Sequence, residues 1–291
     1  MSTTATVADA LEAALPGRVQ RDAPSAALTT DRGGGPIAVR VRAGGDEDLA
    51  AVAAAARAHS VEVLVIGRGS NLLVADEGFA GIGVVLEGGF ESLDVDAAAG
   101  EVRAGGAVAL PVLARRAASA GVSGLEFFVG IPGSVGGAVR MNAGGHGCET
   151  KDVLVDARVF SFDDSAARVL GVEALALGYR RSGLGPREVV TAARFRGEPA
   201  ADPAASAARI DEVVRWRREH QPGGQNAGSV FTNPPGDAAG RLIEASGCKG
   251  LRIGGARVSE QHANFFVADP GARARDVHAL VLEVQRRVAE A

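Results

Sequence analysis

The residues most able to do chemistry lie in two glycine-rich segments of the N-terminal two thirds of the chain. GRGSN, residues 67–71, follows the apolar run VEVLVI, and GIPGSVGGAVRMNAGGHG, residues 130–147, follows GLEFFV. Glycine tolerates the positive φ that successive backbone N–H groups need in order to converge on an anion. The two segments could therefore wrap one extended cofactor from two sides.

The first segment does not match the common nucleotide fingerprints. A doubly wound dinucleotide fold needs GxGxxG opening a helix whose N-terminus holds the pyrophosphate. Leu72 stands where the third glycine would be, and the apolar pattern beyond it predicts a strand. The phosphate-loop pattern GxxxxGK[ST] is also absent. GRGSN by itself could be a plain tight turn, and the second segment shifts the interpretation to cofactor binding.

The second segment could be an exposed loop, but its apolar residues argue for burial. Val135, Ala138, Val139 and Met141 are too apolar for a freely solvated loop. Ser134 and Asn142 could give neutral hydrogen bonds to phosphate or ring atoms. The cofactor-binding candidates are Gly67, Arg68, Gly69, Ser70, Asn71, Gly130, Ile131, Pro132, Gly133, Ser134, Gly136, Gly137, Asn142, Ala143 and Gly144.

The elements that must position these segments follow from hydrophobic periodicity. We predict helices over 46–59, 108–120, 207–220 and 271–290, a short helix near 172–177 and another in AGRLIEASG. We predict strands over VEVLVI, 153–162, 187–196 and NFFVAD, a hairpin over 92–104, and a long loop system over 130–147. The polar segment 198–206, with two prolines, is the expected domain boundary.

Composition excludes several classes of partner. The chain has 291 residues, 46% of them hydrophobic, and a formal charge of -4, which favours two ordinary globular domains and a small-molecule partner over nucleic acid. Cys148 and Cys248 lack metal-ligand spacing, so we expect reduced thiols and no metal site. No stretch of 18 apolar residues and no basic leader occurs, so we expect a cytoplasmic protein without a membrane segment.

The chain from about residue 24 to its end resembles the UDP-N-acetylenolpyruvoylglucosamine reductase family, in its shorter subtype without an extra tyrosine-containing loop, and six blocks in order carry the resemblance. The blocks are IGRGSNLLVADEGFAGIGVVL, GLEFFVGIPGSVGGAVRMNAGGHG, YRRS, GSVFTNP, AGRLIEASGCKGLRIGGARVS and HANFFV. The resemblance implies an α+β chain. Residues 1–200 would form a two-lobed FAD-binding fold of the vanillyl-alcohol-oxidase (PCMH) type, with lobes at about 20–90 and 91–200, and residues 201–291 would form a C-terminal α/β substrate-binding domain.

The resemblance also implies a reaction. NADPH would reduce FAD, the flavin would pass hydride to C3 of the enolpyruvyl ether, and a proton would reach C2 to give UDP-N-acetylmuramate for peptidoglycan. We expect the protein to do this as a monomer.

Two residues match the family's catalytic positions. Arg180 of YRRS matches an arginine facing the developing negative charge, which a fixed guanidinium stabilises more in the transition state than in the ground state. Ser229 of GSVFTNP matches the proton donor, although a serine hydroxyl is a weak acid that needs relief of its alkoxide. Tyr179 and Ser182 would hold Arg180, and Tyr179 could instead simply pack.

Further residues of the matching blocks are candidates for substrate binding. They are Tyr179, Asn233, Lys249, His262 and Asn264. Lys249 could equally be a solvated surface lysine, and His262 a satisfied core histidine.

The chain departs from the family pattern in two places. His146 stands where many relatives carry an aromatic residue. The family's catalytic glutamate is expected in a strand beyond the last helix, and neither Glu283 nor Glu290 matches it. An alternative is therefore a flavin and nucleotide-sugar binding protein with impaired turnover. A third interpretation is a flavin oxidase, for which His146 and Cys148 are the candidates for a covalent FAD link.

Overall fold

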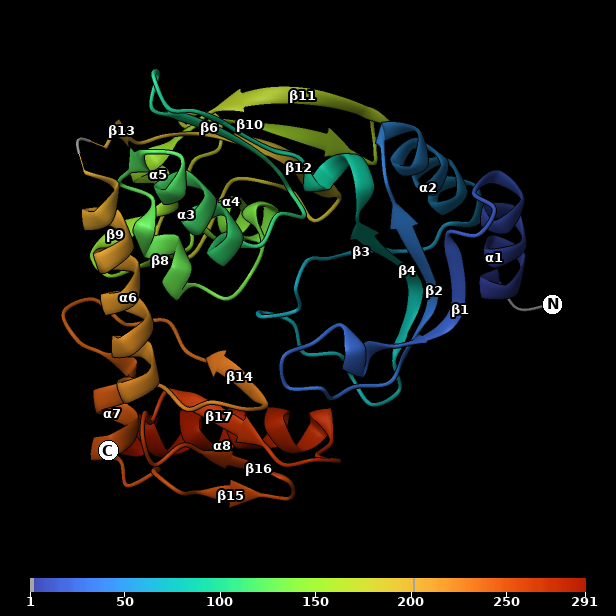
Figure 1. The fold of residues 1–291 in the computed structure, drawn as a ribbon. Helices are drawn as coiled ribbons and strands as arrows, with labels where there is room; N and C mark the ends of the chain where they lie inside the picture. Colours follow the sequence, from blue (N-terminus) through green and yellow to red (C-terminus); the bar gives the residue numbers. More distant parts are fainter. Residues whose placement is uncertain (1–2, 201) are drawn as a thin grey trace. The chain divides into compact units, whose positions relative to one another are not determined.

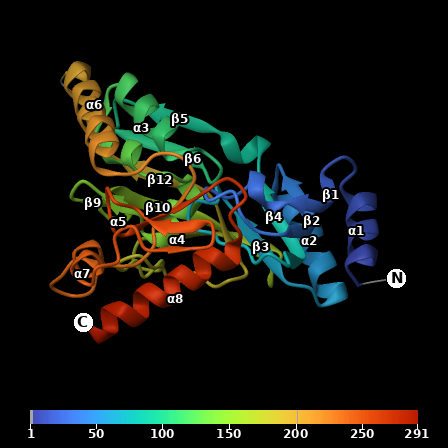
Figure 2. The same ribbon diagram turned by 90° about the horizontal axis from the view of Figure 1, so that it is seen from below.

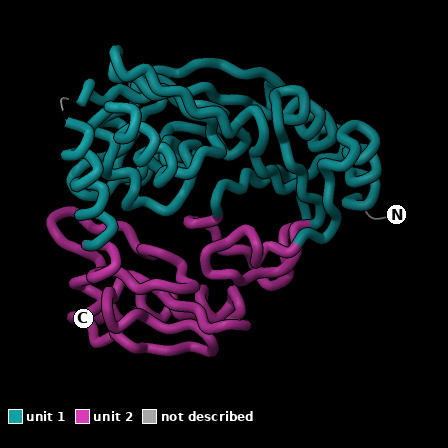
Figure 3. The backbone as a smooth tube through the Cα atoms, in the orientation of Figure 1, with its two compact units in different colours: residues 1–23, 38–68, 80–215 teal, residues 24–37, 69–79, 216–291 magenta. Residues whose placement is uncertain are grey.

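The structure, a computed structural model, describes residues 3–200 and 202–291 and contains two compact units (Figure 3). Unit 1 comprises residues 1–23, 38–68 and 80–215, and unit 2 comprises residues 24–37, 69–79 and 216–291. Both units are discontinuous in sequence. The domains expected at 1–200 and 201–291 stay a prediction, because a compact unit is a set of packed residues and not a functional boundary.

The first sheet belongs almost wholly to unit 1 and has the strand order β1-β2-β4-β3 (Figure 1). Its strands are β1 (Val19–Pro24), β2 (Pro36–Ala43), β3 (Val63–Ile66) and β4 (Phe79–Leu86). The helices of this part of the chain are α1 (Thr3–Ala14) and α2 (Asp46–His59). Helix α2 starts with three acidic residues and carries Arg57 and His59 in its last turn, which suits the helix dipole. Buried residues of α1, α2, β2 and β4 form one hydrophobic core.

The second sheet of unit 1 has the order β11-β10-β12-β6-β5, and every neighbouring pair is antiparallel. Its strands are β5 (Leu93–Asp96), β6 (Glu101–Gly105), β10 (Leu154–Ser161), β11 (Ala166–Gly171) and β12 (Glu188–Arg196). The helices beside it are α3 (Leu110–Ser119), α4 (Val135–Met141), α5 (Thr150–Val153) and α6 (Pro203–His220), and α6 continues into unit 2. Short pairs join β7 (Val122–Ser123) to β13 (Glu198–Pro199) and β8 (Gly144–Gly145) to β9 (Cys148–Glu149).

Strands β10 and β12 are buried on both faces. Successive side chains of a strand point to opposite sides, and Val159 packs in the core of α3 and α4 while Phe160 packs in the core of α1 and α2. On β12, Val190 packs in the core of α3 and α4, and Val189 packs in the core of α1 and α2. The two hydrophobic cores of unit 1 therefore share the centre of one sheet.

Unit 2 is built on an antiparallel sheet of order β14-β17-β16-β15. Its elements are β14 (Asn226–Ser229), α7 (Ala239–Ala245), β15 (Arg252–Ile253), β16 (Ala256–Val258), β17 (Phe265–Ala268) and α8 (Ala274–Glu290). Helix α8 contacts β15 and β16 and runs to the C-terminal end of the chain (Figure 2). Val277, Leu280 and Val284 recur at helical spacing on its buried face and pack in the core with Phe266.

Two segments from early in the chain fold with unit 2. The Gly35 N–H donates to the carbonyl of Ala75 at 2.8 Å. The carboxylate of Asp76 accepts from the backbone N–H of Ala274 at 2.9 Å and of Arg275 at 3.3 Å, which satisfies free donors at the start of α8. Gly69 has φ +63°, and a Cβ there would lie 1.7 Å from the carbonyl oxygen of Leu28. No side chain fits at this position of GRGSN.

Most predicted elements are confirmed, and two predictions are wrong. The helices over 46–59, 108–120 and 271–290, the hairpin, and the strands over 153–162 and 187–196 are all observed with small shifts at their ends. The predicted short helix near 172–177 is a series of turns that follows β11, a strand the sequence did not reveal. The loop system over 130–147 contains helix α4. Gly136 fits inside this helix because its bare Cα lies close to strand β12, where a Cβ would be 3.0 Å from the carbonyl oxygen of Val190.

No helix among residues 3–200 and 202–291 is long and apolar enough to cross a membrane. Cys148 and Cys248 are free thiols. No cluster of three or more metal-ligating side chains occurs within the described ranges.

Leu280→Ala should lower the free energy of unfolding by about 2–5 kcal/mol, because Leu280 is fully buried and its truncation leaves a cavity. Leu282→Ala is the matched control. It makes the same change two residues along α8, where Leu282 is 53% exposed, and should shift stability by no more than about 0.5 kcal/mol. Urea unfolding of the two variants measures the difference, and equal losses would contradict the assigned faces of α8.

Candidate functional site

The predicted site residues fall into two groups, one in each unit. Unit 1 holds Gly67 and Arg68, the segment 130–147 and the YRRS turn, and unit 2 holds residues 69–71 and the candidates of the C-terminal third. Each group has its own local geometry.

The two glycine-rich segments meet within unit 1. A Cβ placed on Gly67 would lie 3.0 Å from Oγ of Ser134. Ser134 is the N-cap of α4, where its Oγ accepts from the Gly137 N–H at 3.4 Å. Gly67 and Arg68 are exposed, so the backbone of the first segment lies bare beside the start of the second. Glycine at residue 67 thus keeps the backbone beside Ser134 free of a side chain, a feature expected of an FAD-binding loop pair.

Asn142 holds the second segment together. It ends α4 with φ +40° and is fully buried. Its Nδ2 donates to the carbonyl of Gly178 at 3.0 Å and to Oε2 of Glu149 at 3.1 Å, and its Oδ1 accepts from the N–H of Lys151 at 2.9 Å. The polar atoms predicted to face a cofactor thus have partners within the protein, and the side chain links three stretches of chain.

Arg180 lies in a tight turn beside that segment. The turn is closed by Gly178 and Arg181, which exchange backbone hydrogen bonds of 3.1 and 3.2 Å. Arg180 has φ +55°, a conformation that non-glycine residues rarely adopt and that costs free energy. Its guanidinium donates to the carbonyl of Gly144 at 3.0 Å and of Asn142 at 3.4 Å and lies 5.0 Å from the ring centroid of Tyr179. Sequence reasoning did not reveal this strain.

The neighbourhood of Arg180 also contains a charge that the sequence did not single out. Glu149 bonds Lys151 at 2.8 Å, and that contact is the main reason that the pKa of Glu149 is below its usual range; Asn142 and the charge of Arg180 lower it further. The carboxylate therefore stays ionised beside Arg180. Ser182 donates to the carbonyl of Arg140 at 2.7 Å and so ties the YRRS turn to the end of α4.

Unit 2 has a cavity of about 420 Å³ that gathers several predicted residues. It is lined by Ser229, Asn233, Ala238, Gly240, Arg241, Glu244, Gln261, His262, Ala263 and Asn264. One cavity is therefore lined by the residues of GSVFTNP and HANFFV that were predicted to donate a proton and to bind substrate. Lys249 does not line it, but its Nζ binds Oε1 of Glu244 at 2.8 Å. The sequence missed Arg241, Glu244 and Gln261. The first two lie one turn apart on α7, a spacing that puts them on one face.

Electrostatics at this cavity are set by local pairs. The bond from Arg241 lowers the pKa of Asp237 to about 2, helped by the N–H of Ala238. Burial lowers the pKa of His262, and the charge of Lys249 contributes in the same direction. The Nδ1 of His262 accepts from the N–H of Asn264 at 3.2 Å, so the neutral ring carries its proton on Nε2.

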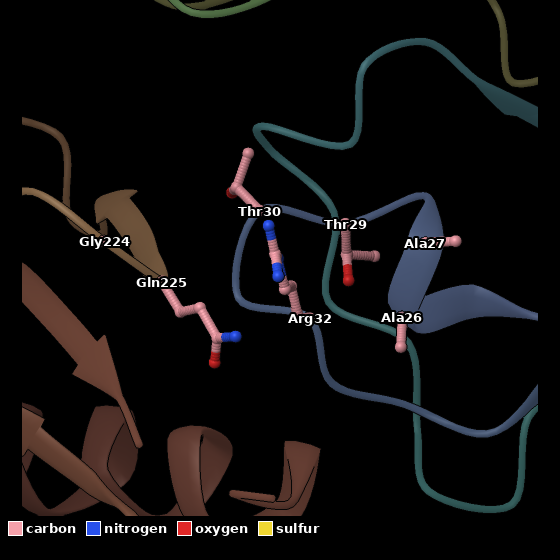
Figure 4. A pocket seen from close by; sticks show the side chains of 7 residues that line it. All are labelled: Ala26, Ala27, Thr29, Thr30, Arg32, Gly224 and Gln225. Atoms are coloured by element: carbon pink, nitrogen blue, oxygen red, sulfur yellow. The ribbon is translucent and has the colours of Figure 1, made fainter. Parts of the chain in front are cut away.

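A second cavity in unit 2, of about 700 Å³, contains none of the predicted residues (Figure 4). Its lining comes from two segments of the chain: Ala26, Ala27, Thr29, Thr30 and Arg32, and Gly224 and Gln225. The adjacent residue Asp31 is buried, with one carboxylate oxygen unpartnered, and burial raises its pKa.

Two family models match the chain. The model for an FAD binding domain matches residues 37–169, and the model for the C-terminal domain of UDP-N-acetylenolpyruvoylglucosamine reductase matches residues 220–291. Both glycine-rich segments fall within the first match, and Ser229 and the cavity of about 420 Å³ fall within the second.

Curated relatives resemble nearly the whole chain. The UDP-N-acetylenolpyruvoylglucosamine reductase of Rhodopseudomonas palustris (strain BisB5) is 44% identical over 284 residues, covering 96% of this chain and 90% of that protein. The enzyme of the same name from a strain of Methylorubrum extorquens is 45% identical over 288 residues, covering 97% and 91%.

Solved structures give the same result. The crystal structure of UDP-N-acetylenolpyruvylglucosamine reductase from Thermus caldophilus has a TM-score of 0.81 and 41% identity, covering 92% of this chain and 95% of that one. A variant of Phl p 4, a glucose dehydrogenase, has a TM-score of 0.51 and 15% identity over 75% of this chain and 50% of that one, a likeness of fold alone. The predicted fold class, an FAD-binding domain of the PCMH type with a C-terminal domain, is confirmed.

Asn142→Ala should lower the free energy of unfolding by about 2–5 kcal/mol, since it leaves the Lys151 N–H unpaired and puts alanine, which tolerates the left-handed conformation less well than asparagine does, at φ +40°. Asn142→Gly loses the same hydrogen bonds without the backbone cost and should be milder by about 1 kcal/mol. Urea unfolding compares the two, and equal losses would show that the backbone at residue 142 is not strained.

The stability of the fold should depend on His262 below about pH 6.5. Because the folded pKa is lowered, the unfolded chain takes up the proton first as pH falls, and the fold loses stability below the unfolded value. His262→Gln should therefore reduce the drop in Tm between about pH 7.5 and 5.5. His278→Gln, at an exposed position of α8, is the control. If the drop in Tm is the same in His262→Gln as in wild type, His262 is not the group that makes stability depend on pH.

Proposed function

The chain belongs to the UDP-N-acetylenolpyruvoylglucosamine reductase family, and we propose that it reduces the enolpyruvyl group of UDP-N-acetylglucosamine enolpyruvate to give UDP-N-acetylmuramate. The reaction uses FAD as cofactor and NADPH as reductant and belongs to peptidoglycan precursor synthesis. The observation that carries the assignment of residues is the cavity of about 420 Å³, where Ser229 meets residues from the HANFFV block about thirty positions away.

The residues present in unit 1 fit the cofactor. Residue 67 carries no side chain beside Ser134, so a ligand can approach the backbone of the first glycine-rich segment closely. Gly67, Arg68 and the backbone of the predicted residues of 130–144 would hold FAD there. Bound FAD supplies hydride transfer between NADPH and the substrate.

Ser229 is proposed to donate the proton that C2 of the enolpyruvyl group requires. Its Oγ lines the cavity and accepts a hydrogen bond from Nδ2 of Asn264 at 2.9 Å. A serine hydroxyl is a weak acid, so its donation depends on a strong carbon base and on stabilisation of the alkoxide left behind.

Arg180 is proposed to stabilise negative charge on the substrate carboxylate. Backbone carbonyls of Asn142 and Gly144 fix its guanidinium, and a fixed cation loses little free energy of reorganisation when charge develops. The strained backbone of the turn supports this role, because strain persists where the surroundings hold it and concentrates at functional positions.

The uridine diphosphate part of the substrate calls for cationic and amide donors. Arg241 and Gln261 line the cavity. Lys249 does not line it but donates a hydrogen bond to Glu244, which does. Asn233 accepts from the N–H of Ala239 through Oδ1 and so is held at the start of α7. We assign these groups to binding of the nucleotide sugar. Tyr179, beside Arg180, is assigned to the same ligand.

The alternatives differ from this proposal in what they require. A flavin oxidase with covalent FAD would need His146 or Cys148 as the attachment point, and a mass measurement of the purified protein would reveal the link. Glu283 and Glu290 both bind Arg286 on α8, so neither matches the expected third catalytic residue. The expectations of a cytoplasmic location and a monomer stay predictions, and sedimentation of the purified protein tests the latter.

The proposed activity predicts that the purified protein shows flavin absorbance and oxidises NADPH only when UDP-N-acetylglucosamine enolpyruvate is supplied. Product is identified as UDP-N-acetylmuramate by mass. The proposed activity would be refuted if the purified protein carried no flavin, or if it did not reduce UDP-N-acetylglucosamine enolpyruvate in the presence of NADPH.

Ser229→Ala should slow reoxidation of the reduced flavin by the substrate by about 10²–10⁴-fold, the range expected for a lost general acid. Reduction by NADPH should change little, since it needs no proton from this residue. Stopped-flow absorbance separates the two half-reactions. Ser246→Ala, a serine of unit 2 that bonds the carbonyl of Leu242 and lies outside the cavity lining, is the control. Equal slowing of both half-reactions would assign Ser229 to folding instead.

A further inference from the structure

The side chain of Asn264 makes three hydrogen bonds around Ser229. Its Nδ2 donates to Oγ of Ser229 at 2.9 Å and to the carbonyl of Phe231 at 2.8 Å, and its Oδ1 accepts from the N–H of Phe231 at 2.9 Å. We propose that Asn264 is the positioning residue of the proton donor: its amide both aims the hydroxyl of Ser229 and stabilises the alkoxide. This inference rests on the proposed function and gives Asn264 a role other than binding substrate.

The orientation of the amide is fixed by the chain. The Phe231 N–H can only donate, so the atom facing it must be Oδ1, and Nδ2 then faces the Phe231 carbonyl and Ser229. Asn264 is only 3% exposed, and its backbone carbonyl oxygen also accepts from the N–H of Val230 at 2.9 Å. A buried, fully bonded amide has no low-energy alternative orientation.

This orientation directs the hydroxyl proton. An NH₂ group has no lone pair for a serine to donate to, so the Ser229 O–H must point away from Asn264. Ser229 itself is exposed at the cavity wall, whereas Asn264 lies behind it. The proton therefore remains available for a group bound in the cavity.

The same contact favours the proton transfer energetically. As the O–H bond breaks and a C–H bond forms at C2, Ser229 Oγ gains the electron pair and becomes an alkoxide. The hydrogen bond from Nδ2 then becomes charge-assisted and stronger. Because the donor is already in place, no reorganisation is needed at that moment, as in an oxyanion hole.

The contact lies next to an irregularity of the sheet. Ser229 pairs with Phe265 and Asn226 with Val267, so the two strands have a register shift between these pairs. Beyond Ser229 the strand ends, and the side chain of Asn264 takes over the pairing by bonding both backbone groups of Phe231. Positioning of the serine and completion of the strand are thus achieved by one amide.

Asn264→Asp removes the donor while it keeps the size of the side chain. The carboxylate still accepts from the Phe231 N–H, but it replaces Nδ2, the donor to both Ser229 and the Phe231 carbonyl, with an acceptor that captures the serine proton. Reoxidation of reduced flavin by UDP-N-acetylglucosamine enolpyruvate should slow by about 10²–10³-fold, the cost of one oxyanion donor. Reduction by NADPH, and calorimetric affinity for UDP-N-acetylmuramate, should stay within about threefold of wild type.

The pH profile gives a signature that a purely structural role would not move. Burial raises the pKa of a carboxyl group, and a protonated aspartic acid regains one O–H donor. The reoxidation rate of Asn264→Asp should therefore rise as pH falls, unlike that of wild type. In a Ser229→Ala background, Asn264→Asp should add almost nothing, because its effect passes through Ser229. Asn226→Asp is the control: it makes the same change on β14, with Oδ1 bonded to the Gly228 N–H.

A readout independent of activity uses FAD-loaded, ¹⁵N-labelled protein. Of the two amide protons on Nδ2 of Asn264, the one bonded to Ser229 should shift upfield in Ser229→Ala, while the one bonded to Phe231 should stay. This measurement keeps the inference testable if Asn264→Asp does not fold.

Unchanged reoxidation in Asn264→Asp, additive effects in the double variant, or an unmoved amide resonance would overturn the inference. A wild-type protein that binds flavin yet is not reoxidised by the substrate would instead overturn the proposed function on which it rests.

Discussion

Buried asparagine amides hold the irregular backbone of both candidate sites. A chain that leaves a helix or strand exposes N–H and C=O groups that regular structure no longer pairs, and burial makes each unpaired group costly. Asn142 supplies the missing partners at the end of α4, and Asn264 supplies them beyond β14. The loops that carry Arg180 and Ser229 are ordered by these two side chains, so the geometry of the reacting groups follows from satisfying backbone hydrogen bonds.

Family membership and local geometry answer different questions. Relatives 44–45% identical over almost the whole chain establish the reductase family and its flavin chemistry. They do not explain how a serine becomes an adequate acid or why an arginine occupies a left-handed conformation. The structure supplies physical reasons: an amide donor behind Ser229, and two backbone carbonyls that hold Arg180. Each reason concerns a residue within one compact unit.

The sequence was informative where a signal is local and failed where it is not. Helix α2 and the hairpin β5–β6 were predictable because their periodicity and flanking residues lie within a short window. Helix α4 was missed because Gly136 disfavours a helix locally, whereas its close contact with β12 favours a residue without a Cβ. Ser229, His262 and Asn264 were selected through family blocks, but the bond between Asn264 and Ser229 spans 35 positions and leaves no mark on either segment alone. Arg241, Glu244 and Gln261 were missed because nothing in their own segments shows that they line a common cavity.

The discontinuous course of unit 2 has a consequence for synthesis of the chain. Residues 24–37 and 69–79 emerge from the ribosome early, but they belong to the same compact unit as residues 216–291, and Asp76 receives the N-terminus of α8 only when Ala274 is made. About 200 residues of translation, at 5–20 residues per second, separate the two events. For roughly ten seconds or more the Asp76 carboxylate therefore lacks the helix N-terminus that it bonds in the folded protein, and unit 2 can be completed only near the end of synthesis.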